Sequence, residues 1–207
     1  MIFYMYALRR FGKQLWREPN TVMMASLMML VLSLPVVTVG LALCAGVLYM
    51  HDKEKGIGTS VRQAVRAVRP CAVKALVMGI VDLCCIVACI SAVAWLIAGR
   101  DFGLTLLSTV FLYLALFYLS TAIFRYAILA LNPGLSLSQV AMCAMGVTLK
   151  NLGYVFLYWC VLLLALMICA VTGVGLVLLL PGVTALLMVT AWSESLKKDE
   201  YKRSQTA

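Results

Sequence analysis

Long runs of apolar residues, separated by short polar or charged stretches, dominate the chain. The clearest runs cover residues 74–99, 104–124, 153–172 and 176–192, and an earlier run covers residues 21–50. A helix of about 20 apolar residues is long enough to cross the roughly 30 Å hydrocarbon core of a bilayer. The pattern therefore predicts an all-α protein built as a polytopic bundle of membrane helices.

Composition supports the same interpretation. Of the 207 residues, 64% are hydrophobic and only 12% are charged, and the mean hydropathy is +1.03. Soluble domains are nearer half apolar and a quarter charged. This balance excludes a cytosolic enzyme, a disordered tail and a collagen-like fibre. The eight cysteines show no spacing typical of a zinc site, so we expect neither a metal site nor a cofactor.

The N-terminal residues 1–20 have the pattern of an amphipathic helix. Basic residues recur every four positions at Arg9, Lys13 and Arg17, and apolar residues share another face. A basic amphipathic helix of this kind lies on an anionic membrane surface, and Trp16 stands where an interfacial anchor belongs. We expect an interfacial helix that ends at Pro19.

The apolar run at residues 21–50 is broken near its centre by Pro35. A single straight helix of this length would measure about 45 Å, whereas two full spans need about 40 residues. Thr38 can bond a carbonyl freed by the proline, and Gly40 permits a sharp turn or a close helix contact. The motif is either a structural turn in a helical hairpin or irregular backbone that lines a polar cavity.

Two polar segments, residues 51–70 and 132–151, are expected on the cytoplasmic side. Each contains a Ser-x-x-Gln capping box, at Ser60 and at Ser136, which predicts the start of a short helix. The first of these helices carries a basic row, for which we expect contact with lipid or with a partner protein. This row consists of Arg62, Arg66 and Arg69.

The distribution of the 17 Lys and Arg residues decides how many segments enter the membrane. Cytoplasmic loops carry an excess of these residues. If residues 21–50 form one span, five spans result and the basic residues are split between both sides. If residues 21–50 cross and return, or form a re-entrant hairpin, every basic residue except Arg100 lies in the cytoplasm. We therefore predict about six membrane-inserted segments, the first pair short, with both termini cytoplasmic.

This topology makes residues 21–192 a single transmembrane domain and residues 193–207 a cytoplasmic tail. The exposed outer loops are expected at Arg100–Gly103 and Gly173–Gly175, and Pro181 is expected to kink the last span. A net charge of +9 would raise the question of nucleic acid in a soluble protein. Here the basic residues flank apolar runs, so we expect lipid and no nucleic acid as partner.

Asp82 is the only acidic residue inside a clearly predicted span. A charge at the centre of a membrane helix costs at least about 2.5 kcal/mol, so such a residue usually faces the bundle interior and has a partner. Lys74, two turns earlier, and Arg125, at the cytoplasmic end of the next span, are the candidate partners. Asp82 is either an ion or substrate contact, or a member of a buried pair, or a protonated acid.

The string Leu-Ser-Leu-Pro-Val-Val-Thr-Val-Gly, which ends at Gly40, resembles the L-P-x-x-T-x-G string of the YesL-like family of bacterial membrane proteins. Small residues at Ala42 and Ala45 and a charged Asp-Lys-Glu-Lys-Gly segment ending at Gly56 follow, as in that family. The resemblance implies a multi-helix protein of the bacterial plasma membrane with unknown biochemical function. It also implies an accessory role in carbohydrate uptake, because members often look like neighbours of carbohydrate ABC importers.

Three kinds of function remain distinct at this point. The chain contains no phosphate-binding glycine loop, HExxH or GxSxG motif, so we expect no enzymatic activity and name no catalytic residue. The favoured hypothesis is an accessory or scaffold component that docks on an ABC transporter permease. The alternative is a small transporter in which Asp82 lines the path.

Overall fold

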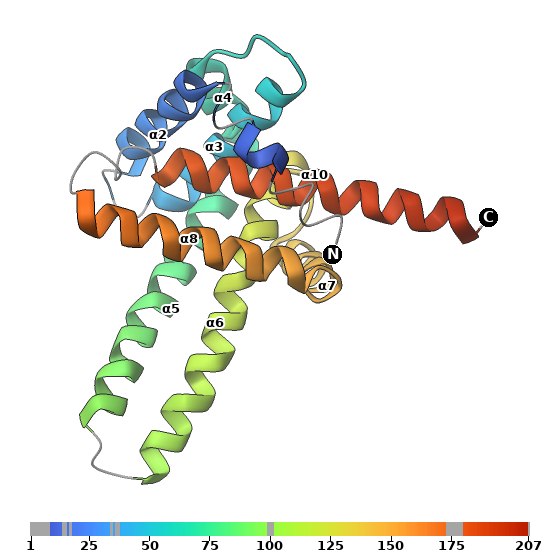
Figure 1. Ribbon diagram of the computed structural model, residues 1–207. Coiled ribbons are helices and arrows are strands. Elements are labelled where there is room, and N and C mark those ends of the chain that lie inside the picture. The colour runs from blue at the N-terminus through green and yellow to red at the C-terminus, as the bar shows by residue number, and fades with distance from the viewer. Residues whose placement is uncertain are drawn as a thin grey trace.

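The computed structural model describes residues 9–13, 16, 18–33, 35, 38–98, 102–172 and 180–206, and no strand occurs among them. The predicted all-α class is therefore confirmed. The helices, labelled as in Figure 1, are α2 Pro19–Ser33, α3 Val39–Glu54, α4 Val61–Ala67, the 3₁₀ turn η2 Arg69–Cys71, α5 Ala72–Ala98, α6 Phe102–Leu131, α7 Leu137–Lys150, α8 Leu152–Thr172 and α10 Leu180–Thr206.

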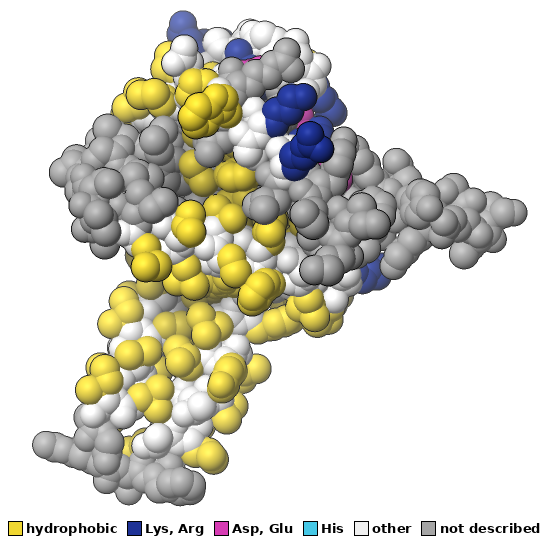
Figure 2. All heavy atoms as spheres, in the orientation of Figure 1, with side chains coloured by type: hydrophobic (Ala, Val, Ile, Leu, Met, Phe, Trp, Pro, Cys, Tyr) yellow, Lys and Arg dark blue, Asp and Glu magenta, His cyan; other side chains and the backbone are white. Residues whose placement is uncertain are grey.

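Helices α5 and α6 pack against each other and project together from the rest of the molecule (Figure 1). The outer half of this hairpin presents apolar side chains on its surface (Figure 2), including Trp95, Ile97, Leu107 and Leu114. Both helices are long and apolar enough to cross a membrane. Bare apolar surface of this extent is stable in lipid and not in water.

The first apolar run folds as a helical hairpin. α2 and α3 pack against each other, and the start of α2 lies beside the end of α3, since Glu18 and Thr21 border the same pocket as Lys53 and Glu54. With 15 and 16 residues, the two helices are about 22 and 24 Å long. Each is shorter than the hydrocarbon core, as a re-entrant pair requires.

The core of the molecule lies where α10, α3 and the inner half of α6 meet. α10 packs on α2, α3 and α6, and Gly182 at its start donates its N–H to Ser26 Oγ of α2 over 2.8 Å. Side chains such as Val47, Phe124 and Val189 are fully buried there. The inner end of the α5–α6 hairpin is thus anchored in a packed body, while its outer end is bare.

The two short polar helices begin as their sequences predict. Ser60 caps α4 and Ser136 caps α7, each with both hydrogen bonds of a capping box. η2 carries Pro70 in its first positions and separates α4 from α5, as expected for a residue that cannot continue the preceding helix.

Some expectations are corrected by the structure. Pro181 does not kink a span: it lies in the first turn of α10, where a proline removes no intrahelical hydrogen bond. α10 then continues without a break through the expected tail to Thr206. α7 and α8 meet at an angle of 90°.

The described residues support part of the predicted set of spans, and the number six stays a prediction. Two helices satisfy the length and hydropathy of a span, or three if the bent pair α7–α8 counts as one. α8 and α10 run across the direction of α5 and α6 (Figure 1). The expected outer loop at 173–175 and the first two residues of the one at 100–103 lie outside the described residues, as do residues 1–8, 14, 15 and 17 of the expected interfacial helix.

Candidate functional site

Asp82 of α5 is buried against α6, and both of its carboxylate oxygens are hydrogen-bonded. Oδ1 accepts a hydrogen bond of 2.8 Å from Arg125 Nη2, and Oδ2 accepts one of 2.7 Å from the Tyr126 hydroxyl. The two donors are consecutive residues of α6, so one short stretch of that helix supplies a hydrogen bond to each carboxylate oxygen. Of the two candidate partners, the structure therefore pairs Asp82 with Arg125.

Arg125 is more deeply buried than its partner, with 3% of the residue exposed. Its guanidinium lies over the ring of Tyr118, 4.0 Å from the ring centroid, seven residues earlier on the same face of α6. The Nε atom has no hydrogen-bond partner among the described residues. Asp82, Arg125, Tyr126 and Tyr118 form what we call the ion-pair cluster.

The cluster lies at the inner end of the hairpin. Along the helix axes, Asp82 is about 24 Å from the end of α5 at Ala98, and Arg125 is about 34 Å from the start of α6 at Phe102. If the far ends of both helices lie at one membrane surface, the pair lies near the other surface. Burial makes the pair costly to break, because either charge alone would be left without compensation.

Lys74, the other candidate partner of Asp82, forms different contacts. Its Nζ donates to the carbonyl oxygens of Pro133 and Leu135 over 2.8 and 2.7 Å. Both carbonyls belong to the turn that joins α6 to α7. Lys74 therefore binds the start of α5 to this turn.

Two cavities flank the ion-pair cluster. Asp82 and Tyr126 border a cavity of about 350 Å³ whose wall is mainly apolar, with Tyr158, Trp159 and Thr184 as its other polar residues. Arg125 and Tyr118 border a second cavity of about 270 Å³, which is closed on one side by the first turns of α7. The acid thus faces one cavity and the base faces the other.

One further polar residue of α6, Ser120, takes part in a contact between helices. Trp159 of α8 donates to Ser120 Oγ over 2.8 Å, and Ser120 donates to the Leu116 carbonyl within α6. The bond between Trp159 and Ser120 therefore joins α8 to α6.

Gly40, at the end of the helix-break motif, lies against α5. The Thr38 hydroxyl donates to the carbonyls of Leu32 and Pro35, and the Thr38 backbone N–H also donates to the Pro35 carbonyl over 2.8 Å. Gly40 lies so close to the backbone of α5 that a Cβ atom there would collide with the Ala75 carbonyl. The described end of the motif thus packs closely on α5, while Leu34, Val36 and Val37 lie outside the described part of the chain.

The basic row of α4 is exposed. Arg62, Arg66 and Arg69 are all open to solvent, while Ala64 and Val68 of the same segment are buried. Lys and Arg side chains gather at the end of the molecule opposite the tip of the α5–α6 hairpin (Figure 2). The row is therefore available for a contact with an anionic surface.

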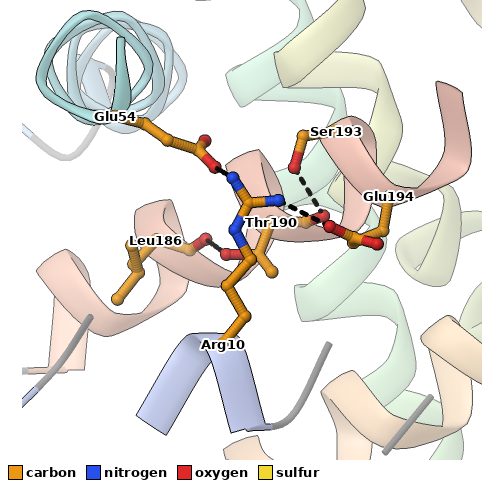
Figure 3. Close-up of polar contacts among 6 residues, drawn as sticks. All are labelled: Arg10, Glu54, Leu186, Thr190, Ser193 and Glu194. Atoms are coloured by element: carbon orange, nitrogen blue, oxygen red, sulfur yellow. Dashed lines mark hydrogen bonds and ion pairs between the residues drawn. The ribbon is translucent and has the colours of Figure 1, made fainter. Parts of the chain in front are cut away.

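A second polar cluster, which the sequence did not indicate, joins three distant parts of the chain (Figure 3). Arg10 forms ion pairs with Glu54 at the end of α3 and with Glu194 of α10, the latter at 2.6 Å. Glu194 is almost fully buried, and Phe11 beside Arg10 is in the core. Part of the N-terminal helix is thus packed on the body, whereas Arg9, Lys13 and Trp16 are exposed.

No local pattern reveals this second cluster, because 184 positions separate Arg10 from Glu194. The signal for Tyr118 and Arg125 is present in the sequence as a seven-residue spacing on one helix face, but it does not indicate stacking. Among the described residues, no group of three or more His, Cys, Asp or Glu residues is placed to hold a metal ion.

Comparison of the chain with protein-family models, curated proteins and solved structures gives no match. The resemblance to the YesL-like family therefore rests on the residues that end at Gly40 and on the charged segment that follows them.

Proposed function

We propose that this protein is an accessory or scaffold component of the bacterial plasma membrane that serves carbohydrate uptake by docking on an ABC transporter permease. The link to carbohydrate uptake rests on the YesL-like resemblance. The accessory role, as opposed to transport, rests on the ion-pair cluster.

The observation that carries the accessory role is that Asp82 is fully engaged within the protein. A carboxylate that binds a transported ion or substrate needs free oxygens facing a polar path. Here Arg125 and Tyr126 occupy both oxygens, and the neighbouring cavity is mainly apolar. The charge joins α5 to α6, which supports a structural role for the acid.

The proposed topology places α5 and α6 across the membrane and the α2–α3 pair partly inside it. Residues 153–172 and 176–192 form the last inserted pair, which gives about six segments with both termini in the cytoplasm. The exposed basic row and the bare outer half of the hairpin, at opposite ends of the molecule, support this orientation.

Transport by the protein itself is the alternative, and one observation favours it. Asp82 borders a cavity of about 350 Å³, large enough for a small solute. In this alternative, the carboxylate exchanges Arg125 for a substrate group during transport. The cost of separating a buried ion pair counts against it.

Affinity purification of the tagged, full-length protein from native membranes tests the accessory role. A permease subunit recovered in a stoichiometric amount, and lost when the basic row is neutralised, is the expected result. Purification without a transporter subunit, together with solute uptake by the protein alone in reconstituted vesicles, would replace the accessory role with transport.

A further inference from the structure

We propose that the cavity beside Asp82 binds an uncharged single-chain lipid, with the alkyl chain along its apolar wall and an oxygen headgroup hydrogen-bonded to Tyr158. The cavity, of about 350 Å³, lies where α3, α5, α6, α8 and α10 converge. Small-molecule sites of this size are mostly apolar and carry a few polar groups that orient the ligand. The inference rests on the proposed membrane insertion and is independent of the accessory role.

The wall of the cavity suits an alkyl chain. Each of the five helices contributes apolar side chains to it, among them Leu43 of α3, Leu119 of α6 and Met188 of α10. Leu83 and Ile86 of α5 belong to this wall and are also exposed at the surface of the hairpin. The cavity therefore adjoins the surface that lipid covers, so a ligand can enter from the bilayer.

The charges at the cavity exclude an ion and favour an uncharged headgroup. The carboxylate of Asp82 is compensated by Arg125, and a cation that replaced this partner would have to break a buried ion pair. No Lys, Arg or His is among the described residues that border the cavity, so an anionic headgroup would find no base there. A neutral oxygen meets neither obstacle.

The hydroxyl of Tyr158 is the polar group left to bind the headgroup. The other polar side chains at the cavity are engaged: Tyr126 donates to Asp82, Trp159 to Ser120, and Thr184 to the Pro181 carbonyl.

Tyr158 packs edge-on against Trp159, with 6.2 Å between the ring centroids, and its hydroxyl forms no hydrogen bond within the described part of the chain. The side chain is only half-buried, so a molecule in the cavity can reach it. In lipid, a hydroxyl without a partner is unfavourable, and a ligand oxygen would supply the missing acceptor.

Photolabelling in vesicles tests this site. The full-length protein is reconstituted in phosphatidylcholine with a hexadecanol analogue that carries a photoreactive diazirine, and labelled peptides are mapped by mass spectrometry. We expect label on the residues of α5, α8 and α10 that border the cavity, removed by excess hexadecanol but not by hexadecane or palmitate. Label confined to bare residues of the hairpin, such as Trp95 and Leu107, would mean contact with bulk lipid only and would overturn the site.

Tyr158→Phe removes only the hydroxyl and should lower labelling of the cavity roughly fivefold, the loss expected for one hydrogen bond between neutral groups. The fold is preserved, because this hydroxyl holds no other group in the described residues. Tyr113→Phe is the matched control, since it makes the same change at an exposed residue of α6 outside the cavity, and it should label as the wild type does.

Two results of this experiment would contradict the proposed headgroup contact. Unchanged labelling of Tyr158→Phe, or displacement by hexadecane as effective as by hexadecanol, would show an apolar cavity without headgroup recognition. Displacement by palmitate as effective as by hexadecanol would show that the cavity accepts an anionic lipid, against the charge argument.

Discussion

At the scale of single residues, the central feature is a buried ion pair in which each charge compensates the other. Arg125 and Tyr126 together saturate Asp82, and Tyr118 covers the guanidinium. A buried ion pair of this kind adds little net stability compared with apolar packing, yet removing only one of its two partners is strongly destabilising. The identity of the partner is therefore measurable by pairwise substitution.

Asp82→Asn should lower the free energy of unfolding by about 3–5 kcal/mol, because Arg125 is left buried and uncompensated. Adding Arg125→Met should recover most of this loss, since the orphaned charge is removed. Adding Lys74→Met instead should recover nothing, because Lys74 binds the turn carbonyls and not Asp82. Denaturant unfolding in detergent measures all three variants. If the Lys74 substitution recovered the lost stability instead, Lys74 and not Arg125 would be the partner of Asp82.

The sequence indicates that Asp82 has a partner, but it cannot choose between Lys74 and Arg125. Lys74 lies eight residues from Asp82 on the same helix, whereas Arg125 depends on how α6 is rotated against α5. Helix rotation is a property of tertiary packing, so the choice requires the structure. The same holds for the ion pairs of Arg10, which join segments that are distant in sequence.

At the scale of elements, local signals predict the helices well. Capping boxes at Ser60 and Ser136, and the Asn-Pro-Gly stop after Leu131, mark real helix ends because they act within one or two turns. Pro181 is misjudged because a proline kinks a helix only when residues precede it in that helix. The 90° bend between α7 and α8 has no such local signal.

Gly40→Ala should destabilise the protein by about 1–3 kcal/mol, since its Cβ meets the α5 backbone, which cannot yield as a flexible side chain does. Gly146→Ala is the control, because Gly146 is also helical, in α7, but has open space where a Cβ would be. The control should be neutral or stabilising by up to about 1 kcal/mol. Thermal unfolding of both variants gives the comparison, and equal effects would rule out a packing role for Gly40.

At the scale of the whole molecule, charge and apolar surface are segregated. The basic row is exposed at one end, and the bare half of the α5–α6 hairpin is at the other (Figure 2). Composition and the distribution of Lys and Arg predict a membrane protein with its basic residues on one side, and which side they face stays a prediction. The directions of α8 and α10 were not predictable, because hydropathy gives the length of a segment and not its angle.

Replacing Arg62, Arg66 and Arg69 together with Gln should weaken association with anionic vesicles or with the partner. The loss should be greatest at low salt, where exposed charges are least screened. Co-sedimentation at two salt concentrations measures it. Binding that is unchanged at both would mean that the row is only a solvated face.

The most direct test of the account is the topology of the chain. Alkaline phosphatase, which is active only outside the cytoplasm, would be fused after Gly56, Arg100, Gly134, Gly175 and Ala207. The account predicts activity after Arg100 and Gly175 and none after the other three. Activity after Gly56 or Ala207, or inactivity after Arg100, would contradict the proposed insertion and orientation.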